Sequence, residues 1–282
     1  MPLRSRAAWV GAATLVAGAV AYARWIEPRW LQLRRRTIHL RTLPPELEGL
    51  RVGILTDLHA GDEAQYAVVR RAVRMLMAER PDLIALTGDF AADDAPGFAE
   101  VFAALDGLSA PLGIFAVPGN HDYTVGIEAW RDAMERHPTF EDLTNRHRII
   151  DLGGVRLCVA GVDDFYEGRP KLRLPPSDER EFTLLLAHSP DEAERCRRAH
   201  DAVGLIVSGH THGGQIRLPF LPAPVNSAER GDLYEEGLRR RPWTQVYTSR
   251  GLGTVHLPLR FFARPEVSVL ELTSAPREAW TG

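Results

Sequence analysis

The chain has 282 residues, of which 45% are hydrophobic and 25% charged, and its formal net charge at pH 7 is −3. These proportions are ordinary for a globular protein with a sizeable core and exclude a disordered or low-complexity chain. The two cysteines, Cys158 and Cys196, lie far apart and in no Cys-x-x-Cys pair, so we expect buried free thiols and no disulfide framework.

The charge is divided unevenly along the chain. Residues 1–41 hold eight arginines and a single acidic residue, Glu27, which gives this leader a net charge of +7 and leaves −10 on the remainder. An acidic body argues against nucleic acid as its main partner, whereas a basic leader favours an anionic surface such as a membrane.

The leader contains a run of seventeen uncharged residues between Arg6 and Arg24. We interpret it as a retained membrane anchor, with a cleaved signal peptide and a buried amphipathic helix as alternatives. The following stretch, RWIEPRWLQLRRR, combines Trp25 and Trp30 with five arginines, a mixture that suits the headgroup layer. Arginines flanking the run favour an inner-membrane protein whose body faces the cytoplasm. We therefore expect an anchor or interfacial segment over residues 1–41 and a folded domain over residues 42–282.

Beyond residue 50, short apolar runs alternate with stretches of helical periodicity. Helices are predicted over 63–79, 97–108 and 124–136. Strands are predicted over 51–56, 82–87, 113–117, 155–162, 182–188, 204–210, 245–249 and 266–272. Regular alternation of this kind predicts an α/β layer fold.

Five of the predicted strands end at side chains that commonly bind metals. These are Asp57 with His59, Asp89, Asn120 with His121, His188, and His210 with His212. In open α/β sheets, sites gather at the carboxyl ends of the strands, so the fold could bring all of them to one place.

Each cluster alone has a simpler reading as a helix cap, a turn or a packed histidine. Five of the ten histidines nevertheless fall on these strand ends. Carboxylate, imidazole and amide ligands without thiolate suit borderline or hard divalent ions, and eight candidates suit two ions better than one. In an extended segment, His210 and His212 would point the same way, so each could serve one ion.

In this order, D-L-H (57–59), G-D (88–89), G-N-H-D (119–122), His188 and G-H-T-H (209–212) resemble the motifs of calcineurin-like metallophosphoesterases. The resemblance covers roughly residues 50–272. The segments 185–191, 208–219 and 249–272 are similar to a bacterial branch that includes membrane-associated phosphodiesterases. The implied fold is two mixed β-sheets packed face to face with helices outside, here preceded by an N-terminal hydrophobic helix.

The resemblance also implies roles for single residues. One divalent ion would be held by Asp57, His59 and His212, and the other by Asn120, His188 and His210. Asp89 would bridge the two ions, and His121 would act on the leaving group without binding metal. Manganese, iron or zinc all fit these ligands. Two subfamilies are disfavoured, because GDFAADD places acids where phosphoprotein phosphatases carry arginine, and Ala60 replaces the tyrosine of purple acid phosphatases.

The predicted reaction is hydrolysis of a phosphodiester or pyrophosphate bond, with a hydroxide shared by both ions attacking phosphorus. Because Phe261 and Phe262 adjoin Arg260 and Arg264, a lipid-linked substrate is favoured. Two further arginines, Arg217 and Arg250, are candidate phosphate contacts.

Two alternatives remain open, a non-catalytic scaffold of the same fold and a soluble nucleotide phosphodiesterase. The sequence predicts no oligomeric state.

Overall fold

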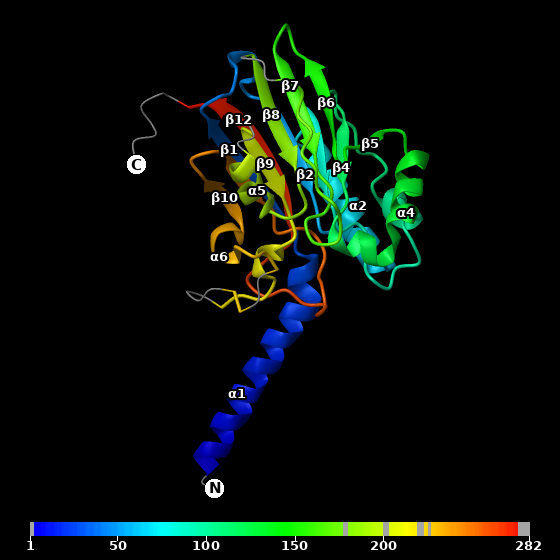
Figure 1. The fold of residues 1–282 in the computed structure, drawn as a ribbon. Helices are drawn as coiled ribbons and strands as arrows, with labels where there is room; N and C mark the ends of the chain where they lie inside the picture. The colour runs from blue at the N-terminus through cyan, green and yellow to red at the C-terminus, as the bar shows by residue number, and fades with distance from the viewer. Residues whose placement is uncertain (1–2, 177–179, 200–202, 219–222, 225–226, 276–282) are drawn as a thin grey trace.

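A computed structural model describes residues 3–176, 180–199, 203–218, 223–224 and 227–275. Two six-stranded mixed β-sheets pack face to face, with helices on their outer faces (Figure 1). The predicted fold class is therefore confirmed, including the N-terminal apolar helix.

The first sheet is parallel through four neighbouring strands and then changes direction. Its order is β1 (Gln32–Leu40), β12 (Glu266–Ser274), β2 (Arg51–Leu55), β3 (Leu83–Thr87), β4 (Ile114–Val117) and β5 (Phe140–Asp142). Strands β2 to β5 are parallel, whereas β12 is antiparallel to β2 and parallel to β1. Because the parallel strands are covered on both faces, they read as unbroken apolar runs in the sequence.

The second sheet has a parallel centre and an antiparallel strand at each edge. Its order is β10 (Gly237–Arg240), β11 (Gln245–Thr248), β9 (Leu205–Ser208), β8 (Glu181–Leu186), β7 (Arg156–Gly161) and β6 (Arg146–Asp151). Only β10 and β6 are antiparallel to their neighbours. The carboxyl ends of β8 and β9 therefore lie at the same edge of this sheet.

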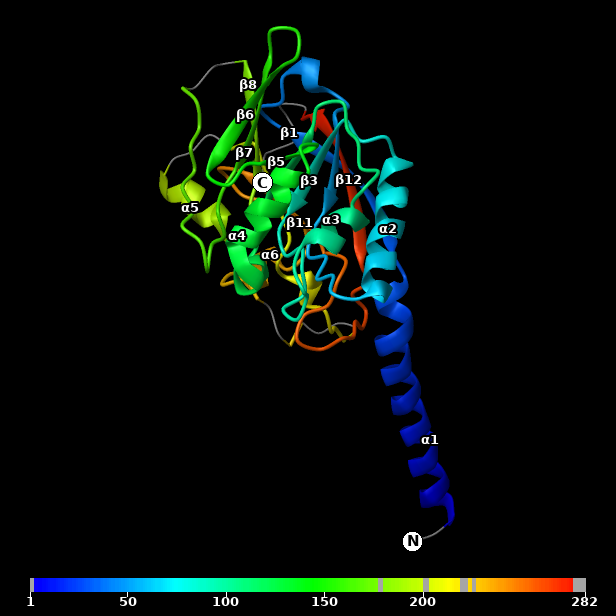
Figure 2. The ribbon, with the colours of Figure 1, turned by 90° about the vertical axis from the view of Figure 1, so that its right-hand side faces the viewer.

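Helices cover the outer faces of both sheets (Figure 2). They are α2 (Glu63–Met77), α3 (Ala99–Ala104), α4 (Asn120–Arg136), α5 (Glu192–Ala199) and α6 (Gly231–Tyr234), with short 3-10 turns at Pro45–Leu47 and His212–Gly214. In α2, Asp62 caps the first turn by accepting the Gln65 N–H at 2.8 Å, and Val69 and Leu76 are buried. This amphipathic spacing is what the sequence predicted for residues 63–79.

The core lies in three layers. The middle layer fills the space between the sheets with side chains such as Ile54, Phe115, Leu184 and Val207. Burial of a side chain of this size stabilises the fold by about 1.5–3 kcal/mol. The outer layer over the second sheet contains both cysteines, which are buried and free as predicted.

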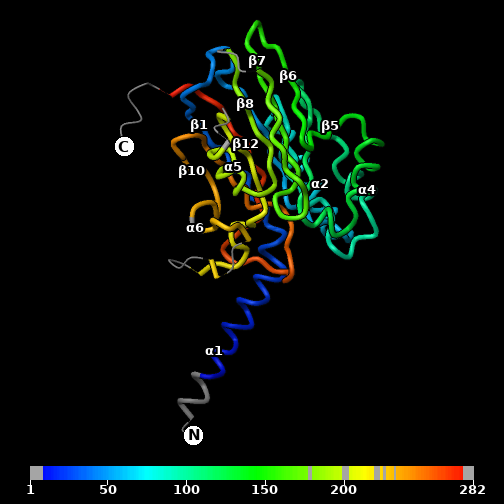
Figure 3. The backbone as a smooth tube through the Cα atoms, viewed as in Figure 1, coloured from blue at the N-terminus to red at the C-terminus, as the bar shows by residue number. Residues whose placement is uncertain are grey.

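The N-terminal helix α1 (Leu3–Ala21) extends away from the two sheets (Figure 1). It continues through a π-helical turn, Tyr22–Ile26, and a 3-10 turn, Glu27–Arg29, into β1 (Figure 3). In the part of the chain that the structure describes, the segment Trp9–Arg29 alone forms a helix long and apolar enough to cross a membrane, and 6% of its most apolar stretch is buried.

The structure places the boundary of the domain earlier than residue 41. Residues 32–40 pair along their full length with β12, so that Gln32 lies opposite Glu266 and Leu40 opposite Ser274. The expected division into 1–41 and 42–282 therefore cuts through the sheet. The reason is that Arg34–Arg36, which suggested a headgroup segment, belong to an edge strand whose arginines face outward or pair with acids.

Candidate metal centre

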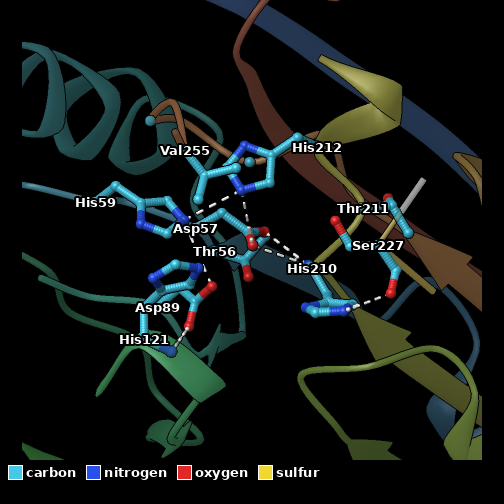
Figure 4. Close-up of polar contacts among 12 residues, drawn as sticks. Thr56, Asp57, His59, Asp89, His121, His210, Thr211, His212, Ser227 and Val255 are labelled. Atoms are coloured by element: carbon cyan, nitrogen blue, oxygen red, sulfur yellow. Dashed lines mark hydrogen bonds and ion pairs between the residues drawn. The ribbon is translucent and has the colours of Figure 1, made fainter. Parts of the chain in front are cut away.

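The predicted ligands converge at one place in the fold, and Figure 4 shows Asp57, His59, Asp89, His210 and His212 among them. Loops after β2, β3 and β4 supply Asp57, His59, Asp89 and Asn120 from the first sheet, and loops after β8 and β9 supply His188, His210 and His212 from the second. Each loop follows the carboxyl end of a parallel strand, which explains why residues 153 positions apart, such as His59 and His212, can touch.

The first ligand group consists of Asp57, His59 and His212, whose ligand atoms all lie within 4.8 Å of one another. The Nε2 atoms of His59 and His212 are 3.1 Å apart, and His212 Nε2 lies 3.5 Å from an Asp57 carboxylate oxygen. All three side chains are buried.

The second ligand group consists of Asp89, His188 and His210. His188 Nε2 lies 3.2 Å from His210 Nδ1 and 3.1 Å from the side-chain oxygen of Asn120. Asn120 therefore joins this group through its amide oxygen.

Asp89 lies between the two groups. Its Oδ2 atom is 3.1 Å from His188 Nε2 and 3.4 Å from His59 Nε2. One carboxylate oxygen thus reaches ligands of both groups, which is the position that a bridging ligand requires.

Hydrogen bonds on the outer side of two histidines fix which ring nitrogen faces the centre. His188 Nδ1 donates to the Thr87 carbonyl at 2.8 Å, and His210 Nε2 donates to the Ser227 carbonyl at 3.2 Å. The other nitrogen of each ring is directed inward, as in metal-binding histidines, and His188 Nε2 would bind a metal once it loses its proton.

The electrostatics of the centre favour a bound cation. Burial lowers the pKa of His59 to about 4 and that of His210 to about 3, so both rings are neutral at pH 7 and their lone pairs are available. Burial also opposes a charge on His188, but Asp89, Asp57 and the nearby Asp164 outweigh it and raise the pKa of His188 well above its ordinary value. These buried carboxylates therefore create a negative potential that a cation can neutralise.

The backbone around the ligands is strained. Asp57, His59, Asp89, His210 and His212 all have positive φ angles, between 39° and 70°. Such conformations persist only where the surrounding structure imposes them, and they gather at functional sites. This corrects one prediction, because His210 and His212 do not alternate along an extended segment. They reach separate ligand groups through tight turns.

Glycines allow the loops to approach the ligands closely. A Cβ atom on Gly209 would lie 2.1 Å from Asp57 Oδ2, and one on Gly119 would lie 2.3 Å from Asp89 Oδ1. Any larger residue at these two positions would displace a ligand carboxylate.

His121 lies at the edge of the centre, next to Asp89. Its backbone N–H donates to Asp89 Oδ1 at 2.9 Å, and its Nδ1 lies 2.5 Å from Asp93 Oδ1. Burial lowers the pKa of His121, but Asp89 and Asp93 outweigh it and raise the net pKa above its ordinary value. The ring of His256 approaches to 6.2 Å between centroids, so this tail histidine also belongs to the rim of the site.

Asp122 has a role that the sequence reading missed, although it lies within the G-N-H-D motif. Its carboxylate is buried and accepts the backbone N–H groups of Asp89, Phe90 and Gly119 at 2.8–2.9 Å. Burial and the Asp89 carboxylate raise its pKa to about 7, although these hydrogen bonds oppose the shift. Asp122 therefore holds the loops that carry Asp89 and Asn120.

The four arginines predicted to contact substrate are all engaged within the protein. Arg217 forms ion pairs with Glu235 and Glu236 at 3.2 and 2.9 Å, and Arg250 forms one with Glu236. Arg264 lies over the Trp30 ring at 4.0 Å and donates to the Trp30 and Leu31 carbonyls.

The prediction that Arg260 contacts substrate is wrong. Its side chain is completely buried and donates to the carbonyl groups of Gly253, Ala263 and Arg250 at 2.6–2.8 Å. A guanidinium in this position holds the tail of the chain against the His212 loop and cannot contact a substrate.

The donor set fits divalent cations. Imidazole, carboxylate and amide ligands are gathered without thiolate, and carbonyl groups orient His188 and His210. The metal-facing atoms lie within contact distance of one another. Comparison with known proteins agrees. The family model for calcineurin-like phosphoesterases matches residues 50–214, which include all seven predicted ligands.

Similar proteins extend the match beyond this region. The metallophosphoesterase YkuE of Bacillus subtilis is 33% identical over 91% of this chain and 91% of its own length. The phosphodiesterase YaeI of Escherichia coli is 31% identical over 89% of this chain and 92% of its own length. A transmembrane protein with a metallophosphoesterase domain from Bos taurus is 31% identical over 85% of this chain, which spans 56% of that protein. The chain therefore belongs to the calcineurin-like phosphoesterase family, whose members use divalent metals and hydrolyse phosphate esters.

Proposed function

We propose that the protein is a phosphodiesterase or pyrophosphohydrolase that uses two divalent metal ions. The observation that carries this proposal is the position of Asp89 Oδ2, within 3.4 Å of histidines from both ligand groups. Two bound ions would supply an activated water at neutral pH and neutralise charge on the phosphate group. The resemblance of the chain to YaeI, which is named a phosphodiesterase, supports a diester over a monoester.

The residues of the chain have separate tasks in this reaction. Asp57, His59 and His212 would hold one ion, Asn120, His188 and His210 the other, and Asp89 both. His121 would donate a proton to the departing oxygen. Its Nδ1 is held by Asp93, and the raised pKa favours the protonated ring that a general acid requires.

We also propose that α1 anchors the protein in the inner membrane, with the domain on the cytoplasmic side. The apolar segment Trp9–Arg29 and the transmembrane relative support an anchor, and the flanking arginines support this orientation. Contacts at the end of the helix favour a retained anchor over a cleaved signal. The Ala23 carbonyl accepts the backbone N–H of Arg260 at 2.9 Å, and the Glu27 carboxylate accepts the backbone N–H groups of Phe262 and Ala263.

Metal analysis of the full chain followed by a substrate panel tests the proposal. After saturation with manganese, iron or zinc, we expect two ions per chain and turnover of bis(p-nitrophenyl) phosphate faster than that of p-nitrophenyl phosphate. A folded preparation that binds two ions and hydrolyses neither phosphodiesters nor pyrophosphates would contradict the proposal and favour the alternative of a non-catalytic scaffold. Faster turnover of the monoester would overturn the proposed bond preference.

A further inference from the structure

A cleft of about 400 Å³ opens beside the metal centre and reaches the base of the N-terminal helix. Its lining includes Arg24 and Arg29 from the turns that end this helix, and His59 and His256 from the metal centre and its rim. Two cations of the proposed anchor and a predicted metal ligand therefore line the same cleft.

Both cations are available for an anionic ligand. Arg24 is partly buried, and its side chain forms no hydrogen bond or ion pair with any residue that the structure describes. The Arg29 side chain donates to the Trp25 carbonyl at 3.0 Å, and no carboxylate among the described residues pairs with it. Guanidinium groups bind phosphate in a bidentate manner, so two of them beside a metal site favour a phosphorylated ligand.

Carboxylates also line the cleft, but most of them are engaged. Asp62 caps α2 through the Gln65 N–H, and Asp93 pairs with the imidazole of His121. Asp94 is the remaining carboxylate of the lining, and Arg24 and Arg29 are the two guanidinium groups there that a phosphate can contact.

Exposed apolar side chains lie at the base of the helix and on the tail segment, and one of them, Leu257, also lines the cleft. Five of them are between 51% and 59% exposed, namely Trp25, Ile26, Trp30, Leu257 and Phe262. They come from the base of the helix and from the tail segment, which lie side by side in Figures 1 and 2 and are joined by the Arg260 N–H to Ala23 carbonyl bond. We name these five residues the apolar rim. Exposed tryptophans mixed with arginines at the end of an apolar helix are typical of surfaces that lie in the headgroup layer.

Building on the proposed function, we propose that this cleft binds the phosphate-containing headgroup of an anionic membrane lipid. Arg24 and Arg29 hold the headgroup, and the apolar rim lies against the bilayer that delivers it. A phosphodiester or pyrophosphate held there lies next to His59, so the substrate class of the metal centre is a lipid with such a headgroup.

Lipid binding to the full chain tests this inference without any need for turnover. Phosphatidylglycerol and phosphatidylcholine are titrated into the detergent-solubilised protein, and bound lipid is measured by native mass spectrometry. The wild type should prefer phosphatidylglycerol, and Arg24→Gln combined with Arg29→Gln should weaken its binding at least about tenfold, as expected for lost charged hydrogen bonds. Arg36→Gln is the matched control, because it removes an exposed arginine of the neighbouring edge strand.

Each result has a defined meaning. Equal binding of phosphatidylglycerol to the wild type and the double variant, or an equal loss in the Arg36→Gln control, would overturn the inference. If soluble glycerophosphoglycerol competes as well as the lipid, the cleft is a site for free phosphodiesters and the role of the bilayer is wrong. Bound phosphatidylglycerol should also raise the KM for bis(p-nitrophenyl) phosphate in the wild type only. Lipid binding without any hydrolysis would contradict the proposed function but support the lipid-binding site.

Discussion

The guanidinium of Arg260 lies 3.2 Å from His212 Nδ1, and it also contacts the His212 carbonyl at 3.4 Å. A buried cation beside a metal ligand keeps that imidazole neutral, because both burial and the neighbouring charges, Arg260 among them, lower the pKa of His212. The same side chain binds three further carbonyls from the tail. Arg260 thus links the position of the tail to the charge of His212, a member of the first ligand group.

Replacement of Arg260 should therefore affect both stability and metal binding. Arg260→Met leaves several buried carbonyls without donors, and each such group costs about 1–3 kcal/mol. We expect a loss of at least this size in the free energy of unfolding, measured with urea, together with weaker binding of one ion. Arg36→Met, on the exposed face of β1, should change neither quantity. Unchanged stability in Arg260→Met would contradict this structural role.

Asp89→Asn should remove the shared ligand. We expect at most one ion per chain by elemental analysis and the loss of nearly all diester turnover, because an amide bridges two cations poorly. The matched control is Asp106→Asn, which removes an exposed carboxylate away from the centre. If Asp89→Asn kept two ions and normal turnover, the bridging role would be wrong.

His121→Ala should separate catalysis from metal binding. We expect two bound ions and a kcat about 10²–10⁴-fold lower, the range for loss of a general acid. Its ring also lies within ligand distance of His59 and Asp89, so metal content decides between the two roles. Loss of an ion in this variant would make His121 a ligand.

Removal of the metals should loosen the contact between the sheets. The ligands come from both sheets, and ions that bind only the folded chain stabilise it by about 2.7 kcal/mol at a free concentration of 100 times Kd. Dialysis against EDTA should lower the Tm, and added manganese or zinc should restore it. The Asp89→Asn variant serves as the control, since its Tm should respond less. An equal Tm with and without metal would show that the centre does not bind ions tightly.

The Glu236 carboxylate should make stability depend on pH. Burial raises its pKa, but Arg250, Arg34 and Arg217 outweigh this and lower it to about 2 from an ordinary value of 4.5. A carboxyl whose pKa is depressed by folding stabilises the fold above its unfolded pKa and loses that contribution as pH falls toward the folded value. Glu236→Gln should therefore be less stable than the wild type at pH 7, and the difference should shrink below about pH 4.5.

Urea unfolding at pH 7 and pH 4 measures this difference. Exposed Glu128, which pairs only with Arg131 in the described contacts, provides the control Glu128→Gln, with little change at either pH. A difference for Glu236→Gln that grows toward low pH would contradict the predicted sign.

Much of the centre could be predicted because its ligands follow strands that are easily recognised. The apolar runs before Asp57, Asp89 and His188 are uninterrupted, and parallel strands bring their carboxyl ends together. The positive φ angles of these loops leave little trace in the sequence, because glycine is the usual signal of a left-handed turn, and aspartate and histidine adopt other conformations far more often.

The edge strands and the arginines were harder to predict. β1 carries three successive arginines and is half exposed, so its apolar alternation is weak and a headgroup segment was the natural interpretation. The partners of Arg260 and Arg264 are carbonyl groups distant in sequence, such as those of Arg250 and Trp30. Composition near a motif cannot distinguish an arginine that binds phosphate from one that binds the backbone.

The direct passage of the N-terminal helix into β1 has one more consequence. Hydrogen-bonded turns fill the whole interval from Tyr22 to Arg29, and β1 begins three residues later, so no flexible tether separates the proposed anchor from the domain. A protein held in this way keeps a fixed height and tilt above the lipid plane. It would meet its substrates by lateral diffusion in two dimensions, and molecules far from that plane would lie beyond its reach.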